Sequence, residues 1–139
     1  MQGFSSFICY ELKITMKKLE KYLTLQLDEY GVNFAQSLIL LCLLEEDGSI
    51  LSEIGSRTQI ENSSLTSMAD KLERRGLVQR RPDAQDRRII RVFLTPGGKE
   101  MAERLLEAGK AFNRYLEKKL DGLEKPLITS LNIIAETLE

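Results

Sequence analysis

Residues 62–98 read NSSLTSMADKLERRGLVQRRPDAQDRRIIRVFLTPGG, and this stretch decides the fold. Its first part has apolar residues at the three- and four-residue spacing of an amphipathic helix, at Leu65, Met68, Ala69 and Leu72. Gly76 supplies a C-terminal stop for that helix. Two short runs with alternating apolar residues follow, at residues 77–81 and 88–94, on either side of a turn-forming segment. The stretch therefore predicts a helix followed by a β-hairpin.

Three helices are predicted upstream of this stretch. Residues 51–58 form a short helix that leads through a tight turn into the helix of residues 62–75. Residues 34–46 are apolar almost all round, so we expect this helix at the centre of the core. Residues 4–29 carry the spacing of an amphipathic helix. A short helix, a tight turn, a second helix and a basic hairpin together predict a winged helix-turn-helix.

Capping residues mark the other helix boundaries. Asn33 is placed to cap the helix of residues 34–46, and Thr95 followed by Pro96 opens a helix that continues toward Lys119. Pro126 then leads into a terminal helix. Helices formed by the two ends of so small a chain leave an apolar face exposed, and a second copy of the chain is the simplest cover. We therefore expect a two-fold dimer.

The whole chain has the length and composition of one globular domain. Its 139 residues are 42% apolar and 29% charged, and no run of about 18 apolar residues predicts a membrane span. The first ten residues carry neither a basic region nor a small-residue cleavage site, so they do not predict a signal peptide. We expect a cytoplasmic protein.

Enzymatic chemistry is not predicted. Histidine is absent, which removes the commonest general base and metal ligand. Cys9 and Cys42 lie among apolar residues and are expected to be reduced thiols rather than a disulfide. The sequence has neither a glycine-rich phosphate loop nor a paired-carboxylate signature. We therefore predict no enzyme activity, no metal site and no cofactor.

Positive charge is concentrated in one segment of the chain. The formal net charge is −1, which by itself argues against binding to DNA phosphates. Residues 57–91, however, contain nine basic and five acidic side chains, a net charge of +4, so the rest of the chain carries −5. The distribution therefore favours a nucleic-acid surface in the same segment that predicts the winged helix-turn-helix.

The helix of residues 62–75 has a face rich in small hydroxyl groups. With Leu65 at the centre of the buried face, helical geometry places Ser63, Ser67, Asp70 and Arg74 near the opposite face, and Ser64, Thr66 and Lys71 on the flanks. Small hydroxyl side chains let a helix approach base edges, and basic side chains such as Lys71 and Arg74 reach phosphates. The alternative is that these hydroxyls only decorate a solvated helix.

The predicted hairpin carries five guanidinium groups, at Arg80, Arg81, Arg87, Arg88 and Arg91. Arginines gathered on two short strands and their connection are suited to entering a minor groove or gripping its flanking phosphates. A solvated, charged hairpin without a partner is the alternative.

A specific motif links this hairpin to a known family. Asp86, Arg88, Val92, Leu94, Thr95 and Gly98 fit, without a gap, the wing pattern D-x-R-x-x-x-V-x-L-T-x-x-G of the MarR family, and the chain resembles that family over nearly its whole length. The segment of residues 72–78, LERRGLV, looks like the family's passage from recognition helix to wing. The resemblance implies one mainly α domain (α+β) over residues 1–139. In it, residues 33–95 form the winged helix-turn-helix lobe, and residues 4–30 and 97–139 form dimerisation helices.

The resemblance also implies how such a dimer binds double-stranded DNA. One recognition helix per subunit lies in each of two successive major grooves, the wings reach neighbouring minor grooves, and the operator is roughly palindromic with half-sites about one helical turn apart. The recognition residues carried over are Asn62, Ser63, Ser64, Thr66 and Ser67, with helix capping as an alternative role for Asn62. Asp86 braces the wing through a nearby arginine, and Arg87 and Arg88 are the candidates for minor-groove insertion.

Two release mechanisms are typical of the family: binding of a small anionic or phenolic molecule, and oxidation of a cysteine. We expect a repressor released by a ligand. The alternative is an organic-peroxide sensor using Cys9, which lies about where the family's peroxide sensors carry their reactive cysteine, although Lys13 and Leu23 stand where those sensors have tyrosines. A third alternative, of another class, is a protein-interaction module that has lost DNA binding, for which the overall acidity is the motive.

Overall fold

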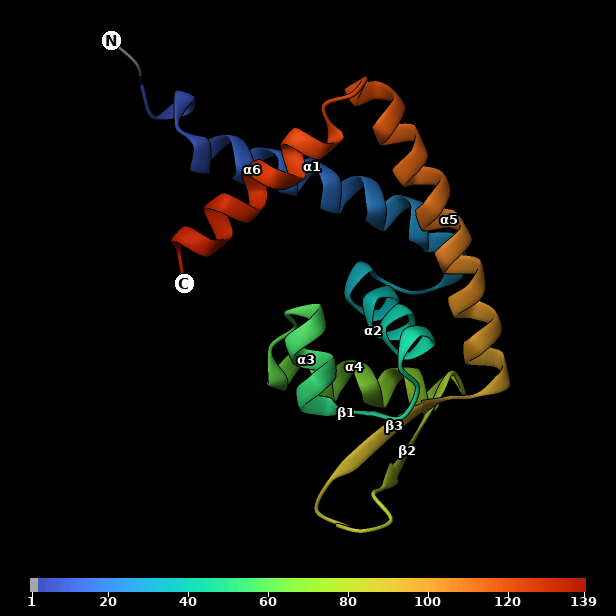
Figure 1. The fold of residues 1–139 in the computed structure, drawn as a ribbon. Coiled ribbons are helices and arrows are strands. Elements are labelled where there is room, and N and C mark those ends of the chain that lie inside the picture. The colour runs from blue at the N-terminus through green and yellow to red at the C-terminus, as the bar shows by residue number, and fades with distance from the viewer. Residues whose placement is uncertain (1–2) are drawn as a thin grey trace. The chain divides into compact units, whose positions relative to one another are not determined.

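The computed structural model describes residues 3–139; Met1 and Gln2, which begin the segment without signal-peptide features, lie outside them. The chain divides into two compact units, one ending at Glu103 and the other comprising Arg104–Glu139. The boundary falls inside a long helix. In chain order the elements are η1 (Phe4–Ser6), α1 (Ile8–Leu27), η2 (Asp28–Tyr30), α2 (Phe34–Glu45), β1 (Ser49–Ile50), α3 (Leu51–Thr58), α4 (Asn62–Arg74), β2 (Val78–Pro82), β3 (Ile90–Leu94), α5 (Pro96–Leu120) and α6 (Glu124–Thr137), and Figure 1 labels the α-helices and the strands.

Helix α2 supplies the centre of the core in the first unit. Ile39, Leu40 and Leu43 of α2 are buried, and α2 contacts α1, α3, α4 and β3. The Asn33 side chain accepts a hydrogen bond from the Gln36 backbone N–H, and the Gln36 side chain accepts one from the Asn33 N–H. This capping box satisfies two helix-end donors and confirms the predicted start of α2.

Helices α3 and α4 form the predicted helix-turn-helix. Gln59 takes a left-handed conformation (φ 61°) at the turn, and its backbone N–H bonds to the Gly55 carbonyl. Helix α4 ends at Gly76 (φ 73°), where the Leu77 N–H returns to the Leu72 carbonyl at 3.0 Å and the Gly76 N–H to the Glu73 carbonyl at 2.9 Å. These bonds form a Schellman-type end that turns the chain directly into β2.

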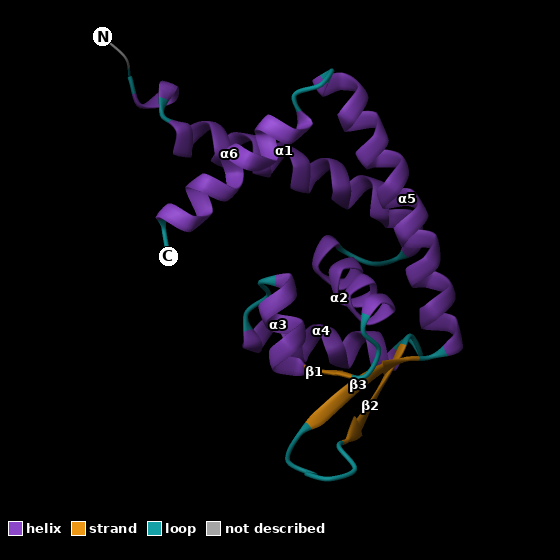
Figure 2. Ribbon diagram, viewed as in Figure 1, coloured by secondary structure: helices purple, strands orange, loops and turns teal. Residues whose placement is uncertain are grey.

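The small sheet has three antiparallel strands in the order β1-β3-β2. Strands β2 and β3 form the predicted hairpin, with Val78 opposite Leu94 and Pro82 opposite Ile90, and Figure 2 shows it as a ribbon that projects beyond the helices of its unit. Strand β1 is an addition to the predicted elements. Its two residues pair with β3, and they are too few to produce a periodic pattern in the sequence.

The predicted mainly α fold with a winged helix-turn-helix is confirmed. The first helix is shorter than expected, because residues 4–6 form a separate 3₁₀ turn and α1 begins at Ile8.

The second unit contains the remainder of α5 and α6, and its large exposed side chains include Leu123, Leu127, Ile128, Leu131 and Ile133. Within residues 3–139 no single helix is long and apolar enough to cross a membrane, although the bent pair Ile8–Tyr30 and Phe34–Glu45 passes the same test by length and composition alone.

Candidate nucleic-acid interface

The exposed surface of α4 carries most of the predicted recognition residues. Leu65, Ala69 and Leu72 are buried and fix which face of the helix points inward. The side chains left exposed by that orientation are Asn62, Ser63, Ser64, Thr66, Ser67, Lys71 and Arg74. Small polar groups thus cover the first two turns of the helix, and its basic groups lie in the last two turns.

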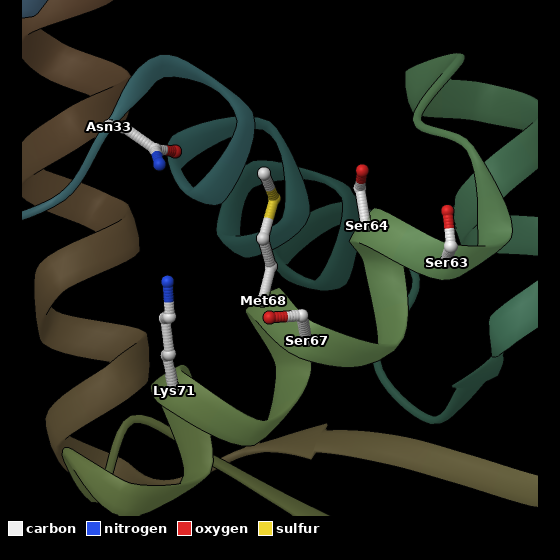
Figure 3. Close-up of a pocket in the computed structure, with 6 residues that line it drawn as sticks. All are labelled: Asn33, Ser63, Ser64, Ser67, Met68 and Lys71. Atoms are coloured by element: carbon white, nitrogen blue, oxygen red, sulfur yellow. The ribbon is translucent and has the colours of Figure 1, made fainter.

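Part of this surface lines a groove between α4 and the start of α2. The groove has a volume of about 280 Å³ and is lined by Asn33, Ser63, Ser64, Ser67, Met68 and Lys71. In Figure 3 the Lys71 side chain and the Asn33 side chain extend into the same hollow from opposite sides, and Met68 points toward α2. The groove is therefore lined by one ammonium group and three serine hydroxyls spread along α4.

Asn62 is the first residue of α4 rather than its cap. Glu61 occupies the cap position and makes no side-chain capping hydrogen bond. The Asn62 carbonyl accepts a hydrogen bond of 3.1 Å from the Thr66 hydroxyl. The alternative role of Asn62 as a helix cap is therefore wrong. Its side chain is exposed in the first turn of α4, where the hydroxyl-rich face begins.

The other side of α4 is tied to the hairpin by Arg80. The Glu73 carboxylate accepts hydrogen bonds from the Arg80 backbone N–H (2.8 Å), from Nε (3.2 Å) and from Nη2 (2.9 Å). Arg80 Nη2 also lies 2.5 Å from Asp70 Oδ1. The Arg80 backbone N–H and guanidinium together hold the pKa of Glu73 below its ordinary value. Asp70, predicted on the open face of the helix, instead faces the wing.

A second arginine ties the hairpin to the turn before β1. Arg91 Nε donates to Asp83 Oδ1 at 2.6 Å, and Arg91 Nη1 donates to the Gly48 carbonyl at 2.9 Å. Asp83 also accepts from the backbone N–H groups of Gln85 and Asp86, each at 3.0 Å. These hydrogen bonds lower the pKa of Asp83. The bond from the Arg91 side chain has the largest effect, and the two backbone N–H groups add to it. Asp83 thus shapes the hairpin loop and fixes it to β3.

The tip of the wing presents Arg87 and Arg88. Asp86 accepts from the Arg88 backbone N–H and from its Nε and Nη2, each at 3.1 Å, and Arg88 nevertheless stays 90% exposed in its side chain. These bonds lower the pKa of Asp86. Nearer the base, the Arg81 guanidinium carbon lies 4.4 Å from the centroid of the Phe93 ring. Asp86 therefore orients Arg88 without removing it from solvent.

The predicted basic residues fall into two groups in this structure. Arg80, Arg88 and Arg91 each pair with a carboxylate of the same helix–hairpin segment. For Lys71, Arg74, Arg81 and Arg87 the described residues 3–139 include no carboxylate within ion-pair distance. The second group supplies the uncompensated positive charge of this surface.

Sequence reasoning missed the role of Arg75. Its Nη1 donates to the Gly31 carbonyl, and its Nη2 donates to the Tyr30 carbonyl at 3.3 Å. Gly31 adopts φ 69°, and its backbone N–H closes the turn after η2 by donating to the Asp28 carbonyl at 3.0 Å. The end of α4 is thereby joined to the segment between α1 and α2. An arginine next to the glycine that follows a helix carries no sequence signal for a partner 44 residues away.

The two cysteines have different environments. Cys9 is exposed in the first turn of α1, whereas Cys42 is buried in α2. Arg57 Nη1 donates to the Cys42 carbonyl at 3.3 Å and lies 3.2 Å from its sulfur, and Arg57 also pairs with Glu45. Burial raises the pKa of the Cys42 thiol. Cys42 is thus a core residue, and Cys9 is the accessible thiol.

Known proteins resemble this chain in sequence and in fold. The profile of the MarR family matches residues 32–90. The HTH-type transcriptional repressor MdtR of Bacillus subtilis (strain 168) is 35% identical over 113 residues, which cover 80% of this chain and 72% of that protein. The HTH-type transcriptional regulator SarZ of Staphylococcus epidermidis is 26% identical over 112 residues, covering 80% and 76%. The crystal structure of overoxidized AbfR bound to DNA is 25% identical, with a TM-score of 0.75 and coverage of 95% and 92%.

Proposed function

This chain belongs to the MarR family, and from that premise we infer that it is a transcription regulator, a repressor, that binds double-stranded DNA. The similarity to the repressor MdtR and to the DNA-bound structure of AbfR supports this function over an enzymatic one. The observation that carries it is the joining of the hydroxyl-rich face of α4 to a basic hairpin within one compact unit.

The arrangement suits a protein that binds two grooves at once. A helix fits the major groove of B-DNA, and the small side chains at the start of α4 permit close approach to the base edges. The hairpin then reaches an adjacent minor groove with its arginines. The residues that we propose to contact DNA are Asn62, Ser63, Ser64, Thr66, Ser67, Lys71, Arg74, Arg81, Arg87 and Arg88, with Asp86 as the support of Arg88.

The regulator acts as a homodimer in this proposal. Residues 33–95 form the DNA-binding lobe, and residues 4–30 and 97–139 form the dimerisation helices. Phe7 and Ile8 of the first unit are 55% and 69% exposed, and Leu127 and Ile128 of the second are 43% and 56% exposed. Apolar side chains of this size are normally covered by a partner, and a two-fold partner matches a roughly palindromic operator. The site of action of such a regulator is the cytoplasm.

Release from DNA follows one of two routes in this proposal. A small anionic or phenolic ligand is the first route, and it acts by changing the spacing of the two recognition helices. Oxidation of Cys9 is the second, and the exposure of that thiol favours it. The relative AbfR has been crystallised on DNA in an overoxidized form, which makes thiol oxidation a chemistry to test here.

The function is tested by measuring the affinity of the purified chain for its own promoter and for random duplexes over a range of salt concentrations. We expect promoter-selective binding that weakens steeply with salt. Hydrogen peroxide, an organic hydroperoxide and salicylate are then added as releasing agents, with Cys9→Ser as the control for thiol chemistry. Absent or salt-insensitive binding would instead favour a protein-interaction module.

We expect Lys71→Ala to lower the affinity for all duplexes alike. Lys71 projects into the groove beside α2 and has no carboxylate partner among the described residues, and we assign this free point charge to a phosphate contact. Loss of one phosphate contact per subunit reduces the slope of log affinity against log salt by about 1 for each site. A loss confined to one base position of the operator would contradict this assignment.

A further inference from the structure

We propose that Arg80 does not bind DNA but positions the wing against the recognition helix, so that the carboxylates of Glu73 and Asp70 strengthen operator binding. The proposal rests on the proposed function, because it assigns roles within the same DNA-binding surface. It reverses the expectation from charge alone, by which every arginine on the hairpin attracts phosphates and every carboxylate on α4 repels them.

The geometry adds polar contacts between two elements, α4 and β2, that follow one another through the turn at Gly76 and also pack together. Glu73 accepts three hydrogen bonds from Arg80, one from the backbone of β2 and two from the guanidinium. The backbone bond holds the middle of the strand, and the guanidinium bonds hold the Arg80 side chain. Asp70, one turn earlier on α4, holds the same Nη2 group. Helix and hairpin are therefore linked at one point by four polar contacts.

The hydrogen bonds of the Arg80 side chain to α4 leave few of its N–H groups available to bind a phosphate. Its side chain is 27% exposed, compared with 90% for Arg88. Nε and Nη2, one of the two guanidinium edges suited to a bidentate contact, face two carboxylates, Glu73 and Asp70, whereas Arg88 faces one and stays open to solvent. Turning that edge toward DNA would leave two carboxylates uncompensated on the surface that faces the phosphates. Arg80 consequently serves as an internal counter-ion of α4.

The position of the wing tip depends on this link. Arg87 and Arg88 lie at the far end of a five-residue strand pair, so a small rotation at the base displaces the guanidinium groups at the tip by a larger distance. Arg91 ties the loop and β3 to the turn before β1, and within residues 3–139 its hydrogen bonds and ion pair go to Asp83 and Gly48 rather than to α4. Buried Val78 and Val92 anchor the base of the hairpin in the core, and the polar contacts of Arg80 add a direct link to the recognition helix that we expect to fix its orientation.

The decisive variant is Glu73→Gln, compared with Glu61→Gln. Both remove one negative charge, but Glu61 is the exposed cap residue just before α4 and makes no side-chain capping bond. We expect Glu61→Gln to raise the affinity for the operator slightly, as removal of a repulsive charge does. We expect Glu73→Gln to lower it severalfold while it raises the affinity for random duplexes. A rise in operator affinity for Glu73→Gln equal to that of Glu61→Gln would overturn the proposal.

Arg80 variants separate positioning from phosphate contact. Arg80→Ala lowers operator affinity while the slope of log affinity for random duplexes against log salt stays unchanged, whereas a phosphate ligand would reduce that slope by about 1 per site. Arg80→Lys recovers part of the operator affinity, because its ammonium still pairs with Glu73. In the double variant Glu73→Gln with Arg80→Ala, the second change causes no further loss. Additive losses, or a reduced slope, would assign Arg80 to DNA instead.

One measurement needs no DNA at all. A spin label attached at Gln85→Cys in a Cys9→Ser background reports the motion of the wing, since Gln85 lies exposed in the hairpin loop. We expect Glu73→Gln and Arg80→Ala to increase the mobility of the label, and Glu61→Gln to leave it unchanged. An unchanged label in all three variants would refute the positioning role. If the wild-type chain binds no promoter but the label responds as expected, the proposed function fails and the link between helix and wing stands.

Discussion

Arg88→Ala is expected to weaken operator binding by on the order of 100-fold and to leave the chain folded and dimeric. Arg88 lies at the wing tip with its side chain 90% exposed, and two hydrogen bonds from its guanidinium to Asp86 hold the direction of that side chain. A side chain held in place before binding loses less conformational freedom on contact with DNA, so its removal costs more than that of an unrestrained neighbour. In the proposed dimer the change occurs in both subunits, which multiplies the loss.

Arg87→Ala is the matched control for this prediction. Arg87 is the adjacent residue, is also exposed and has no carboxylate partner among the described residues. We expect a smaller loss of affinity from it. Binding is measured by fluorescence anisotropy on operator and random duplexes at several salt concentrations, with the dimer checked by light scattering. Unchanged affinity in both variants would refute the assignment of the wing tip to DNA.

Gly98→Ala is expected to destabilise the fold by about 3 kcal/mol, the upper end of what overpacking usually costs. A Cβ atom at Gly98 would run into the Leu77 carbonyl oxygen and would lie 2.8 Å from the carbonyl carbon. The Leu77 carbonyl is held in place because it accepts the Thr95 N–H at 3.1 Å, where β3 passes into α5. Neither backbone segment can move without disturbing the start of the helix that follows the wing.

Gly97→Ala tests whether this effect comes from the close approach rather than from the loss of a glycine. A Cβ at Gly97 meets its nearest atom, the Thr95 hydroxyl oxygen, at 3.8 Å, an ordinary contact. Alanine is the better helix residue, so we expect Gly97→Ala to be neutral or to stabilise the fold by up to about 1 kcal/mol. Urea unfolding at one fixed protein concentration measures both variants. Equal stability of the two variants would contradict the prediction.

The fold was predictable because its boundaries depend on local chemistry. Asn33 and Thr95 cap the helices that they precede, and Gly76 ends α4, as each residue type predicts from its own backbone and hydrogen-bonding preferences. The burial of Leu65 and Leu72 follows equally from their helical spacing. Caps, helix-ending glycines and helical spacing each depend on residues that are close together in the chain, so the sequence alone is enough to predict them.

The ion pairs of the interface were less accessible to prediction. Asp70 was placed on the open face of α4 by helical geometry alone, but the twist of the hairpin brings Arg80 to that side and draws Asp70 toward it. Asp83 and Arg91 are eight residues apart across a loop, and their contact depends on how that loop folds. Pairings between elements require the three-dimensional path of the chain, which residue spacing does not contain.

The pairing of hairpin arginines with carboxylates bears on how such a regulator finds its operator. Arg80, Arg88 and Arg91 each have a carboxylate within hydrogen-bonding distance, so their charges contribute little to the electric field far from the surface. A genome offers an immense excess of competing sites, and a protein with a strongly cationic exterior spends most of its time trapped on them. Compensation within the interface keeps those encounters brief and reserves tight binding for a sequence whose grooves match the helix and the wing.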